Sequence, residues 1–168
     1  QVGWFLHGYR SAWLPALPLQ PHAQAGLVVS MFAASRAWGF ALHFNKGLAG
    51  APPEAIAAAR DTATHPGMVD AFALAICASE GAPAFPGMPG PGPDLAAARR
   101  DAAGVGRAMD ALLKVAPRAG SYVSESDYFE RDWQDSFWGT NYPRLAAVKR
   151  RYDPEGLFFV HHGVGSEG

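Results

Sequence analysis

Apolar and polar positions along the chain follow two different periods. Apolar residues spaced three and four apart are typical of an amphipathic helix, whereas strict alternation predicts a strand with one bulky face. The helical spacing occurs over residues 22–37, 53–64, 94–116 and 141–152. Alternating or compact apolar runs predict strands over 3–10, 38–44 and 70–77, with short strands over 121–124 and 157–161. The alanine content of 70–77 leaves a helix open there, since alanine is the best helix former.

The clearest helix is the one predicted over 94–116. Asp94 stands where an N-cap belongs, and Pro117 and Gly120 follow its last apolar position. The Gly- and Pro-rich stretch 81–93 before it predicts a long surface loop. Long helices separate most of the strands. The strands therefore either pair in parallel through crossovers or interleave as a split βαβ, ferredoxin-like sheet, and the pattern does not choose between them.

Composition places the chain among globular proteins of ordinary domain size. It has 168 residues, of which 49% are hydrophobic and 17% charged, and its net charge of −1 argues against nucleic-acid binding and against a polybasic membrane surface. The single cysteine excludes an internal disulfide framework. No apolar run reaches the roughly 18 residues of a membrane span, and no secretory leader pattern is visible, so we expect a cytoplasmic location.

Common catalytic and metal-binding motifs are absent from the sequence. It contains no phosphate loop, no Gly-x-Ser-x-Gly and no His-Glu-x-x-His. His161 and His162 adjoin, but neighbours on a predicted strand point to opposite faces, so we expect no metal site. The acidic stretch 125–135 is expected to be a solvated surface, and Cys77 a buried small hydrophobe.

Two groups of residues remain as candidates for chemistry. His43 and Asn45 share the small-residue face of the predicted strand 38–44, which either lines a ligand pocket or faces solvent. Tyr142 stands at the start of a predicted helix, where the positive end of the helix dipole would favour its phenolate and make it a base. The alternative is that Asn141 caps the helix and Tyr142 packs on the core, which spacing alone favours.

The segment 137–159, FWGTNYPRLAAVKRRYDPEGLFF, resembles the C-terminal signature of FAD-linked oxidases. These are flavoproteins of the vanillyl-alcohol-oxidase type, in the branch similar to berberine bridge enzyme. The signature combines Gly, Asn-Tyr, Arg-Leu, Val-Lys, Asp-Pro and an aromatic run, and roughly ten fixed positions make it far more specific than a short motif. The segments 120–127 and 42–49 resemble the same family, so the resemblance covers the chain.

The resemblance implies an α+β fold in two parts. Residues 1–120 would form a ferredoxin-like substrate domain, incomplete at its N-terminus, with an antiparallel sheet covered by helices. Residues 121–168 would form a flavin-proximal C-terminal segment that returns to an FAD-binding domain. Nothing in the chain corresponds to the phosphate-binding loop or flavin-linking residues of that domain. FAD is the implied cofactor, and the implied partner is an FAD-binding domain or chain of the same enzyme.

The resemblance also implies roles for particular residues. Asn141 maps onto a flavin-contacting position, and Tyr142 onto a flavin-proximal position that serves as catalytic base in several members. The chain departs from the usual Gln-Ser-Ile ending with Val160-His161-His162, so His161 or His162 is expected to face flavin or substrate. With Trp4, the residues Tyr9, Trp38, His43 and Asn45 are the candidate lining of the substrate pocket.

The implied activity is oxidation of an alcohol or sugar-like small molecule. A hydride passes from a substrate C–H to flavin N5 while the tyrosine base removes the hydroxyl proton. Two alternatives remain: a freestanding ligand-binding domain without redox chemistry, and a structural fragment without a function of its own.

Overall fold

The computed structural model describes residues 3–44, 48–85 and 87–167. Its strands are β1 (Phe5–Pro15), β2 (Ala41–Phe44) and β3 (Ala71–Gly81). Its α-helices are α1 (Gln24–Ala37), α2 (Pro53–Arg60), α3 (Gly67–Asp70), α4 (Leu95–Leu113), α5 (Trp133–Trp138) and α6 (Tyr142–Tyr152). Short 3-10 helices are η1 (Leu17–Leu19), η2 (Val123–Glu125) and η3 (Gly139–Asn141). Asn45, a candidate substrate-binding residue, lies outside the described residues.

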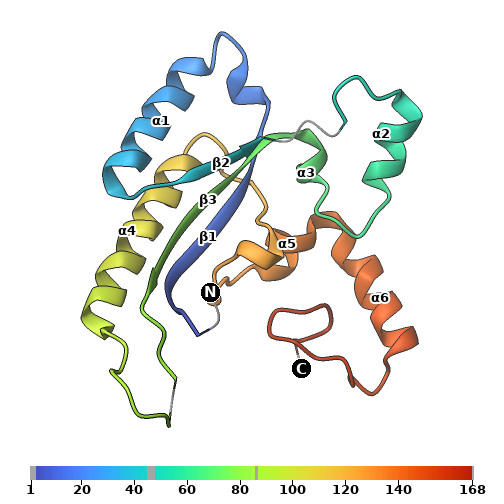
Figure 1. Ribbon diagram of the computed structural model, residues 1–168. Helices are drawn as coiled ribbons and strands as arrows, with labels where there is room; N and C mark the ends of the chain where they lie inside the picture. Colours follow the sequence, from blue (N-terminus) through green and yellow to red (C-terminus); the bar gives the residue numbers. More distant parts are fainter. Residues whose placement is uncertain (1–2, 45–47, 86, 168) are drawn as a thin grey trace.

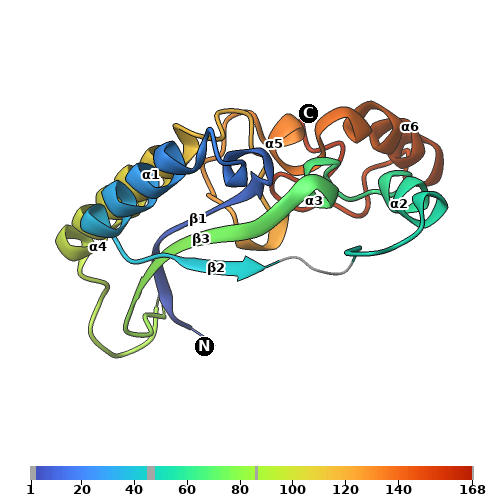
Figure 2. The same cartoon turned by 90° about the horizontal axis from the view of Figure 1, so that it is seen from above.

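The strands form one antiparallel sheet in the order β1-β3-β2. Because both outer strands run antiparallel to β3, β1 and β2 are parallel to each other, and α1 makes the crossover between them. Figures 1 and 2 show α1 and α4 side by side on one face of the sheet. The mixed α and β composition and the antiparallel sheet agree with the sequence prediction. The helices cover one face of the sheet, and the C-terminal elements adjoin the other.

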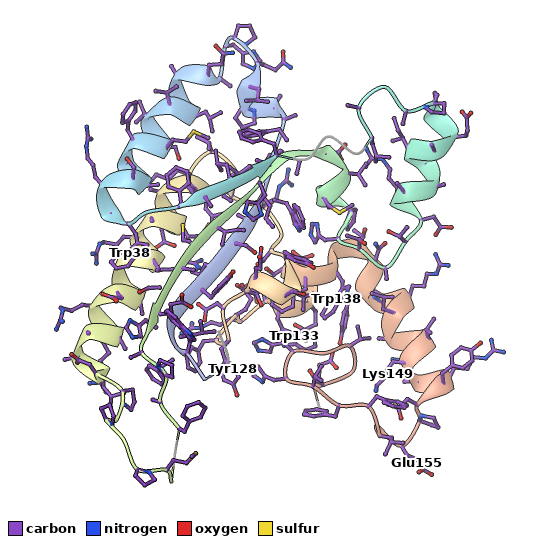
Figure 3. The ribbon with its side chains drawn as sticks, viewed as in Figure 1. Trp38, Tyr128, Trp133, Trp138, Lys149 and Glu155 are labelled. Carbon is purple, nitrogen blue, oxygen red and sulfur yellow. The ribbon has the colours of Figure 1, made fainter. Side chains whose placement is uncertain are left out.

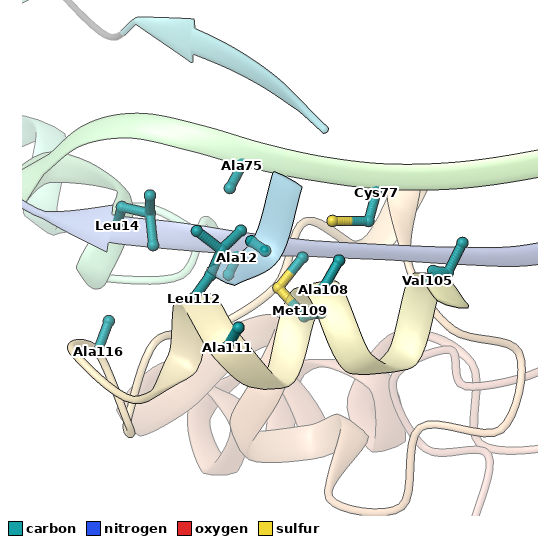
Figure 4. Packing of buried hydrophobic residues seen from close by; sticks show 11 residues of the cluster. Ala12, Leu14, Ala75, Cys77, Val105, Ala108, Met109, Ala111, Leu112 and Ala116 are labelled. Atoms are coloured by element: carbon teal, nitrogen blue, oxygen red, sulfur yellow. The ribbon is translucent and has the colours of Figure 1, made fainter. Parts of the chain in front are cut away.

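The main core fills the space between the sheet and α4. The β1 and β3 residues that face α4 are small, and the helix supplies the larger side chains (Figure 4). The largest fully buried side chains are Leu14, Cys77, Val105, Met109 and Leu112. The helix begins as the sequence predicted, because the Asp94 carboxylate accepts a hydrogen bond from the Ala97 N–H at 2.9 Å.

The opposite face of the sheet has a smaller core. Trp13, Leu74 and Ile76 are buried there. The chain after α4 crosses this side, where the Trp13 N–H donates to the Gly120 carbonyl at 2.8 Å. The hydroxyls of Ser11 and Ser121 are 2.9 Å apart and buried. These contacts anchor the C-terminal segment to the sheet face away from α4.

Two of the predicted strands are absent from the described residues. Instead of a strand over 121–124, the chain turns into η2, because the Ser121 N–H is taken by the Ser136 carbonyl at 2.7 Å. Residues 157–161 are irregular, since the Leu157 and Phe158 N–H groups donate to the Asp153 carboxylate rather than to a neighbouring strand. In both places an acceptor outside the sheet takes the backbone N–H hydrogen bond, so no strand ladder forms.

The strand predicted over 38–44 is shorter than expected. The Trp38 N–H still donates to the Ala34 carbonyl as the C-cap of α1, so β2 begins only at Ala41. Among residues 3–44, 48–85 and 87–167, no helix combines the length and hydropathy that crossing a bilayer requires.

Candidate functional site

Aromatic rings from four separate segments meet beside α6, and we call them the aromatic cluster: Tyr128, Trp133, Phe137, Trp138, Tyr142, His161 and His162. Figure 3 shows Trp133 and Trp138 close together beneath the sheet. The rings of Tyr128 and His161 stack at 4.0 Å, those of His161 and His162 at 3.8 Å, and those of His162 and Trp133 at 5.4 Å. Trp133 then meets Tyr142 edge-on at 5.5 Å. The cluster therefore links the candidate base to both candidate histidines.

Tyr142 is the first residue of α6, as the sequence predicted. Its phenol donates to the Glu167 carboxylate and accepts from the Gly165 N–H at 3.2 Å. Burial and the Glu167 carboxylate together raise the pKa of the phenol. This direction is opposite to the one expected from the helix dipole, because burial and the adjacent carboxylate both disfavour the phenolate. Tyr142 therefore stays protonated near neutral pH.

The two adjacent histidines both join the aromatic cluster. His162 has a positive φ of 56°, which turns its ring back towards His161. Side chains of neighbours on a strand would have diverged, but this segment is a turn. The His161 Nε2 lies 2.8 Å from the Tyr128 carbonyl oxygen. Burial lowers the pKa of His162, and His161 lowers it further. The described part of the chain holds no group of three or more potential metal ligands.

Asn141 faces the loop between α2 and α3. Its amide nitrogen donates to the carbonyl oxygens of Thr62 at 3.0 Å and Thr64 at 2.8 Å. Both hydrogens of the amide are thus used within the chain, and the side-chain oxygen is the part left for another contact. One helical turn further on, Arg144 pairs with Asp61 at 2.5 Å.

His65 is a residue of this region that the sequence reasoning missed. Its Nδ1 accepts a hydrogen bond from the Gly67 N–H at 2.9 Å. A Cβ added at Gly120 would lie 2.4 Å from the His65 Nε2, and one at Gly139 would lie 3.0 Å from it. The His65 ring therefore has room in this position because residues 120 and 139 are glycines. Burial lowers the pKa of His65 against a smaller opposing effect of Asp135. The sequence feature that accompanies His65 is the pair of glycines, and these are equally typical of ordinary loops.

The candidate substrate residues lie on different sides of the sheet. His43 pairs with Leu74, and Leu74 with Trp13, so the exposed His43 lies on the face that the C-terminal segment adjoins. Tyr9 lies on the same face, half-buried, where burial first and then Glu125 raise the pKa of its phenol.

Trp38 lies on the other side of the sheet, where it packs against α4. A Cβ on Gly104 would lie 2.6 Å from its ring, and its indole N–H donates to the Ala78 carbonyl at 2.9 Å. The structure therefore places Tyr9 and His43 on the same face of the sheet and Trp38 on the other side. The exposed Trp4 and Tyr9 border a pocket at the end of β1.

A pocket of about 210 Å³ joins the sheet face to the aromatic cluster. Its walls combine aromatic rings with a few polar groups, and they include Trp13, Thr64, His65, Ser121, Tyr122 and Trp138. Aromatic walls with few polar groups are typical of small-molecule sites. A larger pocket of about 790 Å³ lies away from the cluster, between β2, α2 and α3.

The chain's own residues fit one part of FAD. Stacked rings and a phenol suit the flat isoalloxazine ring. The described helices offer no glycine-rich N-terminus of the kind that holds a diphosphate. The phosphate and adenine parts would need residues beyond the ones described here.

Comparison with known proteins agrees with this geometry. The family model described as "Berberine and berberine like" matches residues 121–165. The matched residues carry the whole aromatic cluster and Tyr142.

Curated relatives of this berberine-like segment are FAD-linked. An FAD-linked oxidoreductase, ffsJ, of Aspergillus flavipes is 48% identical over 61 residues, which are 36% of this chain and 10% of the relative. The VAO-type flavoprotein oxidase VAO615 of Thermothelomyces thermophilus is 42% identical over 60 residues, which are 35% of this chain and 10% of the relative. The resemblance to FAD-linked oxidases is confirmed.

Solved structures extend the similarity to nearly the whole chain. The VAO-type flavoprotein MtVAO713 from Myceliophthora thermophila C1 matches 98% of this chain with a TM-score of 0.68 and 21% identity. MtVAO615 from the same organism matches 97% with a TM-score of 0.66 and 28% identity. The fold is thus that of VAO-type flavoproteins. The chain spans 27% of each solved structure and about a tenth of the curated relatives.

Proposed function

We propose that this chain is the substrate-domain and C-terminal part of an FAD-dependent oxidoreductase that oxidises an alcohol or sugar-like molecule. The observation that carries the proposal is the berberine-like match over 121–165, the segment that builds the aromatic cluster around Tyr142. The partner would be the FAD-binding part of the same enzyme. The β1-β3-β2 order, with β3 between two parallel strands, supports a ferredoxin-like substrate domain.

Bound FAD would supply the hydride acceptor, N5 of the isoalloxazine ring. The chain's part is to hold the substrate and manage its proton. The substrate hydroxyl would donate its proton to the Tyr142 oxygen. Because the pKa of Tyr142 is raised, the phenol would release its own proton to Glu167 in the same step rather than wait as a phenolate. Neither the Tyr142 oxygen nor the substrate oxygen would then carry a negative charge.

The other candidates would surround this centre. The Asn141 side-chain oxygen would accept from the flavin, and His161 or His162 would face flavin or substrate from the stacked column. On the sheet face, Tyr9 and His43 would bind polar groups of the substrate, with Asn45 following His43 in sequence. Trp38, packed on α4, would shape the sheet from behind.

The test is spectroscopic and uses the full-length protein. A flavin absorption band that bleaches anaerobically when an alcohol or sugar is added is the expected result. Two results contradict the proposal: purified full-length protein without a flavin band, or a flavin that no member of an alcohol and sugar panel reduces.

A further inference from the structure

The loop of residues 61–65 connects the two short helices α2 and α3. It contacts the C-terminal segment at several points. Asp61 pairs with Arg144, and the carbonyls of Thr62 and Thr64 both accept from Asn141. The ring of His65 closes the loop against Gly120 and Gly139. We call residues 61–65 the clasp loop. The C-terminal residues that contact the clasp loop through these interactions lie just before η2, in η3 or in the first turn of α6.

The seat of His65 is formed by the absence of two side chains. Gly120 is buried, and any Cβ there would lie 2.4–2.6 Å from three atoms of the imidazole. Gly139 has a φ of 51°, which side chains rarely tolerate, and its backbone faces the same ring. The Gly67 N–H fixes the ring from the other side. The imidazole thus fills the space between Gly120 and Gly139.

We propose that His65 and Asn141 are positioning residues that set the start of α6, and with it Tyr142, through the clasp loop. Two residues separate Gly139 from Tyr142, so a shift of η3 moves the phenol directly. The described residues leave no buried side-chain nitrogen or oxygen without a partner. The clasp combines two amide hydrogen bonds, an ion pair and the packed His65 ring, and several contacts of this kind hold a neighbouring reactive group in place.

The proposal rests on the proposed function only for its kinetic consequence. The claim about position concerns only the start of α6. It is tested by a measurement that does not depend on enzyme activity. Hydrogen–deuterium exchange of the 139–152 peptide in the FAD-loaded full-length protein reports how firmly the start of α6 is held.

The decisive variants are Gly120→Ala, His65→Ala and the double variant, with Gly106→Ala as the matched control. A Cβ at Gly106 meets no atom within 4 Å, whereas one at Gly120 enters the His65 ring. We expect Gly120→Ala to speed exchange of the 139–152 peptide roughly tenfold, the size of a typical coupling between residues in contact. The control should leave exchange unchanged. In the His65→Ala background, Gly120→Ala should add little, because its Cβ then has room.

The kinetic consequence is a lower kcat in Gly120→Ala, with KM and the flavin spectrum retained, because a reactive group displaced by about 1 Å loses on the order of a hundredfold in rate. If Gly120→Ala does not fold, Asn141→Ser provides the same exchange measurement by removing the two bonds to the loop.

Two results overturn the clasp: exchange in Gly120→Ala equal to that of the control, or an equal effect of Gly120→Ala with and without His65. Normal turnover in Tyr142→Phe together with coupled exchange would instead refute the catalytic base and leave the clasp standing.

Discussion

The phenol of Tyr142 donates its hydrogen bond to the carboxylate of Glu167, at the point where the chain returns to the start of α6. This contact raises the pKa of Tyr142 and lowers that of Glu167. A tyrosine beside a carboxylate acceptor can pass a proton on without first becoming a phenolate. The pair is the feature from which the proposed chemistry of the chain follows.

Replacing Tyr142 by phenylalanine removes the hydroxyl and keeps the ring that packs against Trp133. We expect kcat in the full-length enzyme to fall by about a hundredfold or more, the usual contribution of a general base. The flavin band should remain, because the ring packing is retained. Steady-state kinetics with a visible spectrum checks both. An unchanged kcat would remove Tyr142 from the reaction.

Replacing Glu167 by glutamine keeps a hydrogen-bond acceptor for the Tyr142 phenol but removes the charge. Since Glu167 contributes to the raised pKa of Tyr142, we expect that pKa to move downward in the variant. Nuclear magnetic resonance titration of ¹³C-labelled tyrosine measures it. A value equal to that of the wild type would show that the two side chains do not interact in solution.

His65 makes the stability of the protein depend on pH. Burial lowers its pKa, so the folded state prefers the neutral imidazole that accepts from Gly67. The free energy of unfolding should be unaffected above about pH 6.5, the ordinary histidine pKa. It should fall as the pH drops from there through the lowered pKa. Urea unfolding at pH 7.5 and pH 5 measures the difference.

The matched variants for this pH effect are His65→Gln and His43→Gln. His43 is exposed on β2, so its replacement should leave the pH-dependent loss unchanged. His65→Gln should reduce that loss. The same loss in His65→Gln as in wild type would place the acid-sensitive group elsewhere, with His162 as the next candidate because its pKa is also lowered.

Leu112 is fully buried between α4 and the sheet. Leu112→Ala should lower the free energy of unfolding by about 2–5 kcal/mol, because it removes apolar contact and leaves a cavity. Leu157, 80% exposed, is the control, and its change to alanine should stay within about 0.5 kcal/mol. Denaturant unfolding followed by tryptophan fluorescence separates them. Equal effects would mean that the α4 face is not the main core.

Cys77 should be inert in the folded protein. Burial raises the pKa of its thiol to about 11, so very little thiolate is present at pH 8. We expect alkylation of the Cys77 peptide by iodoacetamide to be at least about a hundredfold slower in native than in unfolded protein. Mass spectrometry of that peptide gives both rates. Fast native labelling would contradict the buried position.

Periodicity identified the long elements of this protein because each has one face that repeats within the element. The helix after Asp94 and the alternation over 70–77 carry their own signal. The apolar face of the helix buries in the main core, and Leu74 and Ile76 of the strand bury in the smaller core on the opposite face of the sheet. The berberine-like signature was also readable in advance, because it is a run of neighbouring residues. These features are local, and neighbouring residues are enough to specify them.

Features that depend on distant partners were not readable from the sequence. The predicted strands over 121–124 and 157–161 failed because Ser136 and Asp153 take the backbone N–H groups first. The upward shift of the Tyr142 pKa was set by burial and by Glu167, 25 residues away.

By itself, then, the sequence determined the long helices, the runs that form the three strands and the berberine-like resemblance of the C-terminal segment. Only the tertiary structure decided which rings stack around Tyr142, that Trp38 faces away from His43, and that His65 sits between two glycines. The physical reason is range: helix and strand periods are set within a few residues, whereas pKa values and ring contacts depend on groups that only folding brings together.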